Sequence, residues 1–173
     1  MFGRTARGVR RLYLRAFPKQ ERLPLPLLHA IALRRSCHFL AWFEEGGSDP
    51  CALTYSYVLE DLAYIGFFAV DSTRRGRGLG SRILDEYVRR YPDRAHVLEI
   101  EPVEPGHANS EQRVKRLAFY ERNGFRTTEL MTHQFGEDYS VLVRNGEVSS
   151  ERLQRLLNDF GLGIIRTRVT EEG

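Results

Sequence analysis

The sequence predicts a mixed α/β or α+β protein in which helices cover the faces of a β-sheet. Apolar residues recur at helical spacing in several separate segments, and short runs rich in Val, Ile, Tyr and Phe lie between them. The two patterns alternate along the chain in the order ααβββαβαββα, without an internal repeat or a long linker. With 173 residues, 42% of them hydrophobic, the chain is expected to form a single domain over residues 1–173 with a sizeable core.

The first helix is predicted in the N-terminal stretch MFGRTARGVRRLYLRAFPKQ. Its apolar residues recur at helical spacing and would form one buried stripe: Val9, Leu12, Tyr13, Ala16 and Phe17. The stretch also has the arginine-rich, acid-free composition of a mitochondrial transit peptide, but the stripe favours a helix of the folded protein.

From residue 26 to residue 70 the pattern changes from helical to extended. A second, short helix is predicted from the spacing of Leu27, Leu28, Ile31 and Ala32, with Pro26 tolerated in its first turn. Two β-rich runs, CHFLAWFEE at 37–45 and ALTYSYVLE at 52–60, are joined by GGSD and indicate a hairpin. A third strand is predicted at Leu62–Val70.

A loop rich in glycine and arginine then leads into a helix predicted at Leu79–Arg90. The run HVLEIEPVE at 96–104 indicates a strand that ends at Pro102 and Pro105. A further helix is predicted at Ser110–Arg122.

The helix at Ser110–Arg122 carries signals at both of its ends. Asn109 and Gln112 have the spacing of a capping box. Asn123 and Gly124 supply a left-handed stop.

The C-terminal part is predicted to contain two more strands, at 128–136 and 139–144. Ser149 or Ser150 then caps a final helix. Its apolar residues share one helical face: Leu153, Leu156, Leu157 and Phe160.

The glycine-arginine loop has the composition of an anion-binding turn. Gly76, Gly78 and Gly80 let the backbone approach a ligand closely, and they permit the positive φ angles that aim successive amides at one point. The start of a helix attracts phosphate as well. Three arginines can add charge-assisted hydrogen bonds to phosphate oxygens: Arg74, Arg75 and Arg77.

Two common phosphate-binding motifs do not fit this loop. A Walker loop requires Gly-Lys-Ser/Thr, and no lysine is present here. The dinucleotide motif G-x-G-x-x-G would have its third glycine where Ser81 stands, and three predicted strands precede the loop.

The loop instead resembles the R/Q-x-x-G-x-G/A signature of the GNAT superfamily of N-acetyltransferases, matched by Arg75–Gly80. The segment LAFYERNGF, Leu117–Phe125, resembles the second acetyl-CoA segment of that family and follows the loop after one strand, as the family order requires. The resemblance covers nearly the whole chain and is closest at 62–128. It implies the GNAT fold, a central, mostly antiparallel sheet of about six to seven strands flanked by helices.

The resemblance also implies acetyl-CoA as co-substrate. In the family the loop amides hold its pyrophosphate, and the end of the preceding strand pairs with the pantetheine arm. The backbone at the end of that strand is also expected to polarise the thioester oxygen. The corresponding residues here are Phe68, Ala69, Val70, Arg75, Gly76, Arg77, Gly78, Leu79, Gly80, Ser81 and Tyr120.

For the chemical step, the resemblance implies that the Tyr120 hydroxyl donates a proton to the departing thiolate. Some members that acetylate lysine have a catalytic Glu where this chain has Tyr64, and the family often has an Asn where this chain has Arg113. Glu99 and Glu101 share one face of a predicted strand, so either could bind a cationic amine or deprotonate it. The alternative is that this face is simply solvated.

The leading hypothesis is therefore an acyltransferase that moves an acetyl group from acetyl-CoA to an amine by direct transfer in a ternary complex. The alternative is a non-catalytic acyl-CoA-binding sensor or regulatory domain, which Tyr64 at the usual base position favours. The sequence leaves open whether the acceptor is a small-molecule or a peptide amine. It also leaves open the length of the acyl chain and whether the protein forms a homodimer.

Composition argues against other partners. The formal net charge of +3 does not favour nucleic acid, and no apolar run reaches the roughly 18 residues of a membrane span. Cys37 and Cys51 are too few for a disulfide framework, which favours reduced thiols and a cytoplasmic location. No metal site is expected, because the histidines lack paired ligand spacing: His29, His38, His96, His107 and His133.

Overall fold

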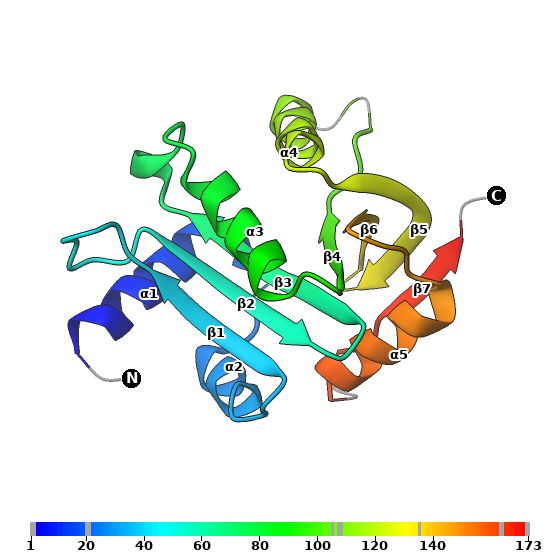
Figure 1. Cartoon of the computed structure of the whole chain (residues 1–173), viewed down its shortest axis with the longest axis horizontal. Helices are drawn as coiled ribbons and strands as arrows, with labels where there is room; N and C mark the ends of the chain where they lie inside the picture. The colour runs from blue at the N-terminus through cyan, green and yellow to red at the C-terminus, as the bar shows by residue number, and fades with distance from the viewer. Residues whose placement is uncertain are drawn as a thin grey trace. The chain divides into compact units, whose positions relative to one another are not determined.

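The computed structural model describes residues 3–19, 22–104, 106, 109–134, 136–162 and 165–171. Within these ranges the chain forms five α-helices, which are α1 (Arg4–Ala16), α2 (Leu25–Ile31), α3 (Leu79–Arg90), α4 (Ser110–Arg122) and α5 (Ser150–Phe160) (Figure 1). It also forms seven strands, which are β1 (Cys37–Trp42), β2 (Ala52–Val58), β3 (Leu62–Val70), β4 (Ala95–Ile100), β5 (Arg126–Gln134), β6 (Glu137–Arg144) and β7 (Arg168–Glu171). A short 3₁₀ helix, η2 (Ser72–Arg74), follows β3.

The seven strands have the order β1-β2-β3-β4-β6-β5-β7. The β1–β2, β4–β6, β5–β6 and β5–β7 pairs are antiparallel. The mixed α/β class with a mostly antiparallel sheet of six to seven strands is confirmed. The chain divides into two compact units, unit 1 with residues 1–59 and 64–87 and unit 2 with residues 60–63 and 88–173. A single domain over 1–173 stays a prediction.

In unit 1, successive residues of β2 face different helices. Thr54 and Ser56 hydrogen-bond to the hydroxyl of Tyr87 on α3, at 2.9 and 3.1 Å. The hydroxyl of Tyr55 donates instead to the carbonyl oxygen of Leu28 on α2, at 3.0 Å. Because strand side chains alternate between faces, α2 and α3 cover opposite faces of the hairpin.

The predicted stripe on α1 is confirmed as part of the core. Val9, Leu12 and Tyr13 are buried. The Tyr13 hydroxyl donates to the Leu23 carbonyl oxygen at 3.1 Å and accepts from the Leu23 N–H at 2.9 Å. The ring of Tyr13 also meets Phe67 of β3 edge to face, at 5.5 Å between centroids. Helix α1 is thereby fixed to the sheet of unit 1.

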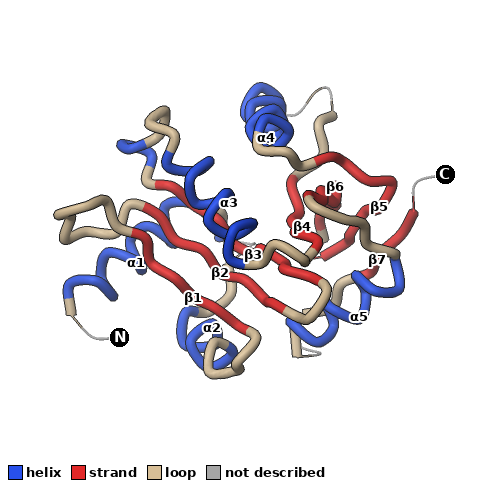
Figure 2. The backbone as a smooth tube through the Cα atoms, in the orientation of Figure 1, coloured by secondary structure: helices blue, strands red, loops and turns tan. Residues whose placement is uncertain are grey.

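In unit 2, α5 packs against β7 (Figure 2). The predicted N-cap is confirmed, since the Ser149 hydroxyl accepts from the N–H of Arg152 at 3.2 Å. The side chain of Arg152 in turn pairs with Asp61. Asp61 belongs to the short segment 60–63 that unit 2 includes.

Three local predictions are wrong. Asn109 makes no side-chain cap on α4, because its side chain is engaged by Glu101 and Arg113 instead. Strand β4 ends at Ile100, two residues before Pro102, and so does not include the last part of the predicted run at 96–104. Strand β7 is absent from the predicted order, and Pro105 lies outside the described residues.

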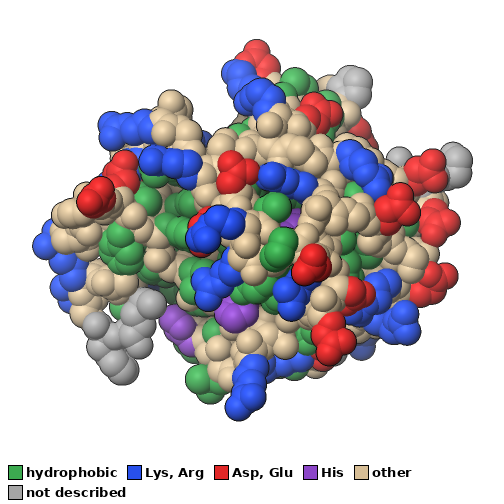
Figure 3. Space-filling model, in the orientation of Figure 1, with side chains coloured by type: hydrophobic (Ala, Val, Ile, Leu, Met, Phe, Trp, Pro, Cys, Tyr) green, Lys and Arg blue, Asp and Glu red, His purple; other side chains and the backbone are tan. Residues whose placement is uncertain are grey.

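Three further features concern the cysteines, the surface charges and the lengths of the helices. Cys37 and Cys51 are free thiols and buried. On the face drawn in Figure 3, basic side chains lie interspersed with acidic ones. Over the described ranges, every helix is too short or too polar to cross a bilayer.

Candidate functional site

The base of the glycine-arginine loop in unit 1 is fixed by side chains. The carboxylate of Asp71 accepts the N–H of Thr73 at 2.9 Å and its hydroxyl at 2.8 Å, which caps η2. The N–H and then the hydroxyl of Thr73 hold the pKa of Asp71 below its ordinary value, against a smaller opposing effect of burial. Arg74, for which a phosphate contact stays a prediction, pairs with Glu44. Arg74 therefore anchors the loop to the end of the hairpin.

The next two glycines of the loop have the expected left-handed backbone. Gly76 has a φ of 76° and Gly78 a φ of 72°. A Cβ added at either position would meet no atom within 4 Å. The glycines are thus needed for their conformation rather than for space in the protein itself. Gly80 differs, because it lies buried in the first turn of α3 without a positive φ.

Helix α3 begins where the loop ends. At its start, the N–H of Arg82 donates to the carbonyl oxygen of Gly78, at 3.1 Å. The amides of Leu79, Gly80 and Ser81 precede that bond and have no acceptor within the helix. They point from a positive dipole end toward the exposed loop, which is the arrangement that binds phosphate.

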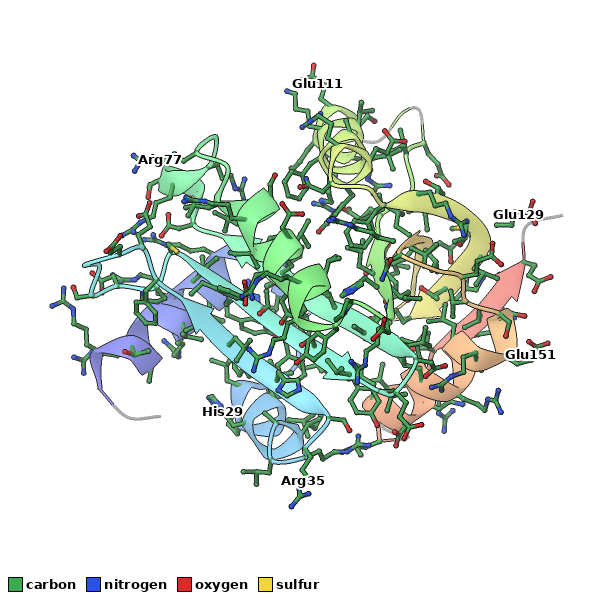
Figure 4. All side chains as sticks on the ribbon, in the orientation of Figure 1. His29, Arg35, Arg77, Glu111, Glu129 and Glu151 are labelled. Carbon is green, nitrogen blue, oxygen red and sulfur yellow. The ribbon has the colours of Figure 1, made fainter. Side chains whose placement is uncertain are left out.

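Two arginines of the loop remain available to an anion. Arg75 and Arg77 are exposed, and Figure 4 shows Arg77 at the tip of the loop. Among the residues that the structure describes, neither side chain has an ion-pair partner. The residues 68–70, predicted to contact the pantetheine arm, are the last three of β3 and lead directly into η2.

In unit 2, Tyr120 lies in the last turn of α4, inside an aromatic cluster. Its ring meets Phe119 and Phe125 edge to face, with centroids 5.1 and 5.7 Å apart. Only 8% of the residue is exposed. Burial raises the pKa of Tyr120 to about 12, although the charge of Arg116 opposes the rise. The phenol therefore stays protonated at neutral pH and can act as a donor.

The chain turn behind Tyr120 is as predicted. Gly124 has a φ of 78°. Its neighbour Phe125 donates its N–H to the carbonyl oxygen of Tyr120 at 3.1 Å. The side-chain amide of Asn123 donates to the carbonyl oxygen of Phe119 at 2.7 Å. The backbone around Tyr120 is thereby held at the end of α4.

Glu101 lies one residue past β4 and is the centre of an ion-pair cluster. Its carboxylate accepts from Asn109 at 3.1 Å, from Arg113 at 3.2 Å and from Arg116 at 2.5 Å. Burial alone would raise the pKa of Glu101, but the hydrogen bond from Asn109 and the charges of Arg116 and Arg113 outweigh it and lower the pKa. A carboxylate held in this way is a weak proton acceptor.

Arg113, at the position where the family often has an Asn, forms a structural cross-link in unit 2. The residue is buried, with 9% exposed. Its guanidinium donates to Asn109 at 2.9 Å and to the carbonyl oxygen of Pro102 at 3.0 Å, besides its bond to Glu101. It joins the first turns of α4 to the segment after β4. Sequence reasoning missed this role, because the groups that Arg113 contacts in Glu101 and Pro102 lie outside the helix and no local pattern specifies them.

Glu99 is half-buried on β4 and has different surroundings from Glu101. Its Oε2 accepts from the Nε2 of Gln134, at the end of β5, at 2.9 Å. Neither glutamate lies on a freely solvated face, since both are half-buried and hydrogen-bonded. The predicted site in unit 2 thus contains one carboxylate engaged by two arginines and one engaged by an amide.

Two of the histidines, His96 and His133, make contacts within the fold. His96 is buried, and burial lowers its pKa, while a hydrogen bond to the carbonyl oxygen of Tyr91 opposes this. His133 pairs with Asp138 and lies 2.9 Å from the hydroxyl of Thr170. In the ranges described, no three or more His, Cys, Asp or Glu residues gather as a metal site would need. His107 lies outside the described residues.

The comparisons with known proteins agree on one family. The sequence profile of the Acetyltransferase (GNAT) family matches residues 6–125. No curated protein matches the sequence.

Solved structures show the same fold. A GNAT-family protein from Bacteroides thetaiotaomicron is 22% identical, with a TM-score of 0.67 over 92% of this chain and 94% of the other. The ribosomal-protein-S18-alanine N-acetyltransferase from Escherichia coli is 18% identical, with a TM-score of 0.58 over 84% and 90%. A GNAT acetyltransferase from Elizabethkingia anophelis, with acetyl-CoA bound, is 15% identical, with a TM-score of 0.54 over 77% and 87%.

Proposed function

Because the chain belongs to the GNAT acetyltransferase family, we propose that it transfers an acetyl group from acetyl-CoA to an amine by direct attack in a ternary complex. The observation that carries the proposal is the exposed loop of unit 1. Two left-handed glycines, Gly76 and Gly78, precede the free amides at the start of α3. That backbone suits a diphosphate, and Arg75 and Arg77 add positive charge.

The proposed reaction has a simple proton balance. The neutral amine attacks the thioester carbonyl carbon, a C–N bond forms, and the C–S bond breaks. Glu99 takes the proton that the amine loses, directly or through water, and Tyr120 gives its proton to the departing thiolate. With a pKa of about 12, Tyr120 carries its proton at neutral pH, as a donor must. Glu99 is preferred to Glu101 as base, because two arginines engage Glu101.

The acceptor is proposed only as a primary amine. The similar enzyme from Escherichia coli acts, by its name, on an alanine of ribosomal protein S18, so peptides with a free N-terminal Ala belong in the substrate panel beside lysine and polyamines. We also propose a reducing, cytoplasmic setting, which the two free buried thiols support.

The test measures CoA thiol release from acetyl-CoA with each amine, for the wild type and for Tyr120→Phe. Turnover with at least one amine and a loss of about a hundredfold in Tyr120→Phe are expected, within the usual range for a general acid. Thermal stabilisation by acetyl-CoA without turnover of any amine would favour the non-catalytic sensor instead. An unchanged Tyr120→Phe rate would remove the assignment of Tyr120.

A further inference from the structure

A chain of hydrogen bonds within unit 2 leads from Glu99 to α5. The first bond runs from the Nε2 of Gln134 to the Oε2 of Glu99, at 2.9 Å. The amide oxygen of Gln134 then accepts from the hydroxyl of Thr167, at 3.4 Å. One side chain thus connects the carboxylate on β4 to the segment before β7.

Thr167 is itself held from the other side. The side chain of Gln154 on α5 donates its Nε2 to the carbonyl oxygen of Thr167 at 2.8 Å and accepts the N–H of Val169 with its Oε1 at 2.9 Å. Thr167 is buried, with 9% exposed. Its hydroxyl donates to the amide oxygen of Gln134, which leaves the Nε2 end of that amide facing Glu99.

We infer that Gln134 is a positioning residue for Glu99. Thr167 engages the oxygen end of the Gln134 amide, so the N–H end points at the carboxylate. A donor aimed at a carboxylate favours its ionised form and restricts its rotamer. The inference deepens the proposed function, because an ionised, oriented Glu99 is the form that accepts a proton from an amine.

Around the Glu99–Gln134 pair, three of the described residues are engaged elsewhere, apolar or exposed. Glu101 lies two residues further on the same face and is engaged by Arg113 and Arg116. The cross-strand partner of Glu99 on β6 is the apolar Val141. Across from Gln134 stands Glu137, which is exposed. Gln134 is accordingly the group to change.

The direct test is a ¹³C NMR titration of the Glu99 side-chain carboxyl, assigned by its loss in Glu99→Gln. The key variant is Gln134→Met, which keeps the length of the side chain and removes the donor. Gln112→Met, at an exposed position on α4, is the matched control. In Gln134→Met the titration midpoint of Glu99 is expected to rise by about one pH unit, because the ionised form loses a hydrogen bond.

A second variant guards against misfolding of the first. Thr167→Val leaves Gln134 in place but lets its amide turn, and a rise of about half a unit in the same midpoint is expected. An unmoved midpoint in a folded Gln134→Met or in Thr167→Val would overturn the inference. An equal rise in Gln112→Met would overturn it too, since the effect would not be local.

The titration separates this inference from the proposed function. It needs no turnover, so a wild type that acetylates no amine contradicts the proposed function alone. With a working substrate, the acidic limb of kcat/KM should move by the same amount as the NMR midpoint. A limb that stays in place while the midpoint moves would overturn the role of Gln134 in the reaction.

Discussion

The loop backbone can be tested at Gly78 with two substitutions of nearly equal shape. Asp and Asn both tolerate a left-handed φ better than other side chains, and Gly78 has a φ of 72°. A Cβ there meets no protein atom within 4 Å. Gly78→Asp and Gly78→Asn should therefore have similar conformational costs, and they differ in one negative charge.

The size of that difference follows from Coulomb's law. A carboxylate about 6 Å from a phosphate charge, at an effective dielectric constant of about 40, costs about 1.4 kcal/mol. Two phosphate charges together cost about 3 kcal/mol, which corresponds to a loss of about a hundredfold in affinity. Gly78→Asn should bind CoA far better than Gly78→Asp, and the gap should narrow with added salt.

The assay is calorimetric titration of CoA into both variants at low and high salt, with thermal unfolding as a check on the fold. Equal melting temperatures would show that the backbone cost is shared. If Gly78→Asp bound CoA within threefold of Gly78→Asn at low salt, the diphosphate would not lie at this loop, and the anion-binding argument would fail.

Four further predictions concern the three residues Tyr120, Tyr13 and Glu101. Tyr120→Phe should lower kcat about a hundredfold and leave the calorimetric Kd for CoA within twofold, because only the transferable proton is removed. Tyr13→Phe should lower the free energy of unfolding by about 1–3 kcal/mol in urea titrations, since both polar groups of Leu23 lose their buried partner. Burial raises the pKa of Tyr13 to about 12 in the folded protein, so on raising the pH the phenol ionises in the unfolded chain before it ionises in the folded one. The free energy of unfolding of the wild type should therefore fall from about pH 10 toward 12. Tyr13→Phe should reduce that fall. Burial would raise the pKa of Glu101, but the hydrogen bond from Asn109 and the charges of Arg116 and Arg113 lower it in the folded protein. Ionised Glu101 therefore stabilises the fold above about pH 4.5, and this contribution is lost as the pH falls further. Glu101→Gln should flatten the acid side of the curve of unfolding free energy against pH, measured by urea unfolding.

The elements that the sequence predicted most accurately are those with strong local signals. Helix α3 begins at Leu79 and ends at Arg90 as predicted, because its apolar residues have clear helical spacing after a glycine loop. Strand β3 spans Leu62–Val70 as predicted. Strand β7 was missed because its four residues, RVTE, contain one apolar side chain and pair only with β5 among the described strands. Its existence depends on a partner that lies far away in the sequence.

The candidate site divides in the same way. The left-handed glycines Gly76 and Gly78 could be predicted, since that conformation is a local property of glycine in a turn. The difference between Glu99 and Glu101 could not, because strand alternation makes the two carboxylates equivalent. Their partners come from α4 and from β5, and no pattern around the glutamates specifies them.

The ion-pair cluster around Glu101 explains how the chain departs from its family without losing the elements that carry the proposed chemistry. An Asn at the position of Arg113 could bridge two backbone groups, whereas the guanidinium here reaches a carbonyl oxygen, an amide oxygen and a carboxylate at once. That cross-link holds the start of α4 against the end of β4, and Tyr120 lies at the other end of the same rigid helix. The cluster engages both oxygens of the Glu101 carboxylate, whereas Glu99 accepts from the amide of Gln134, and this difference supports the proposal of Glu99 as the base. The departure at Arg113 and the proposed choice of Glu99 over Glu101 as base therefore rest on the same arrangement of charges.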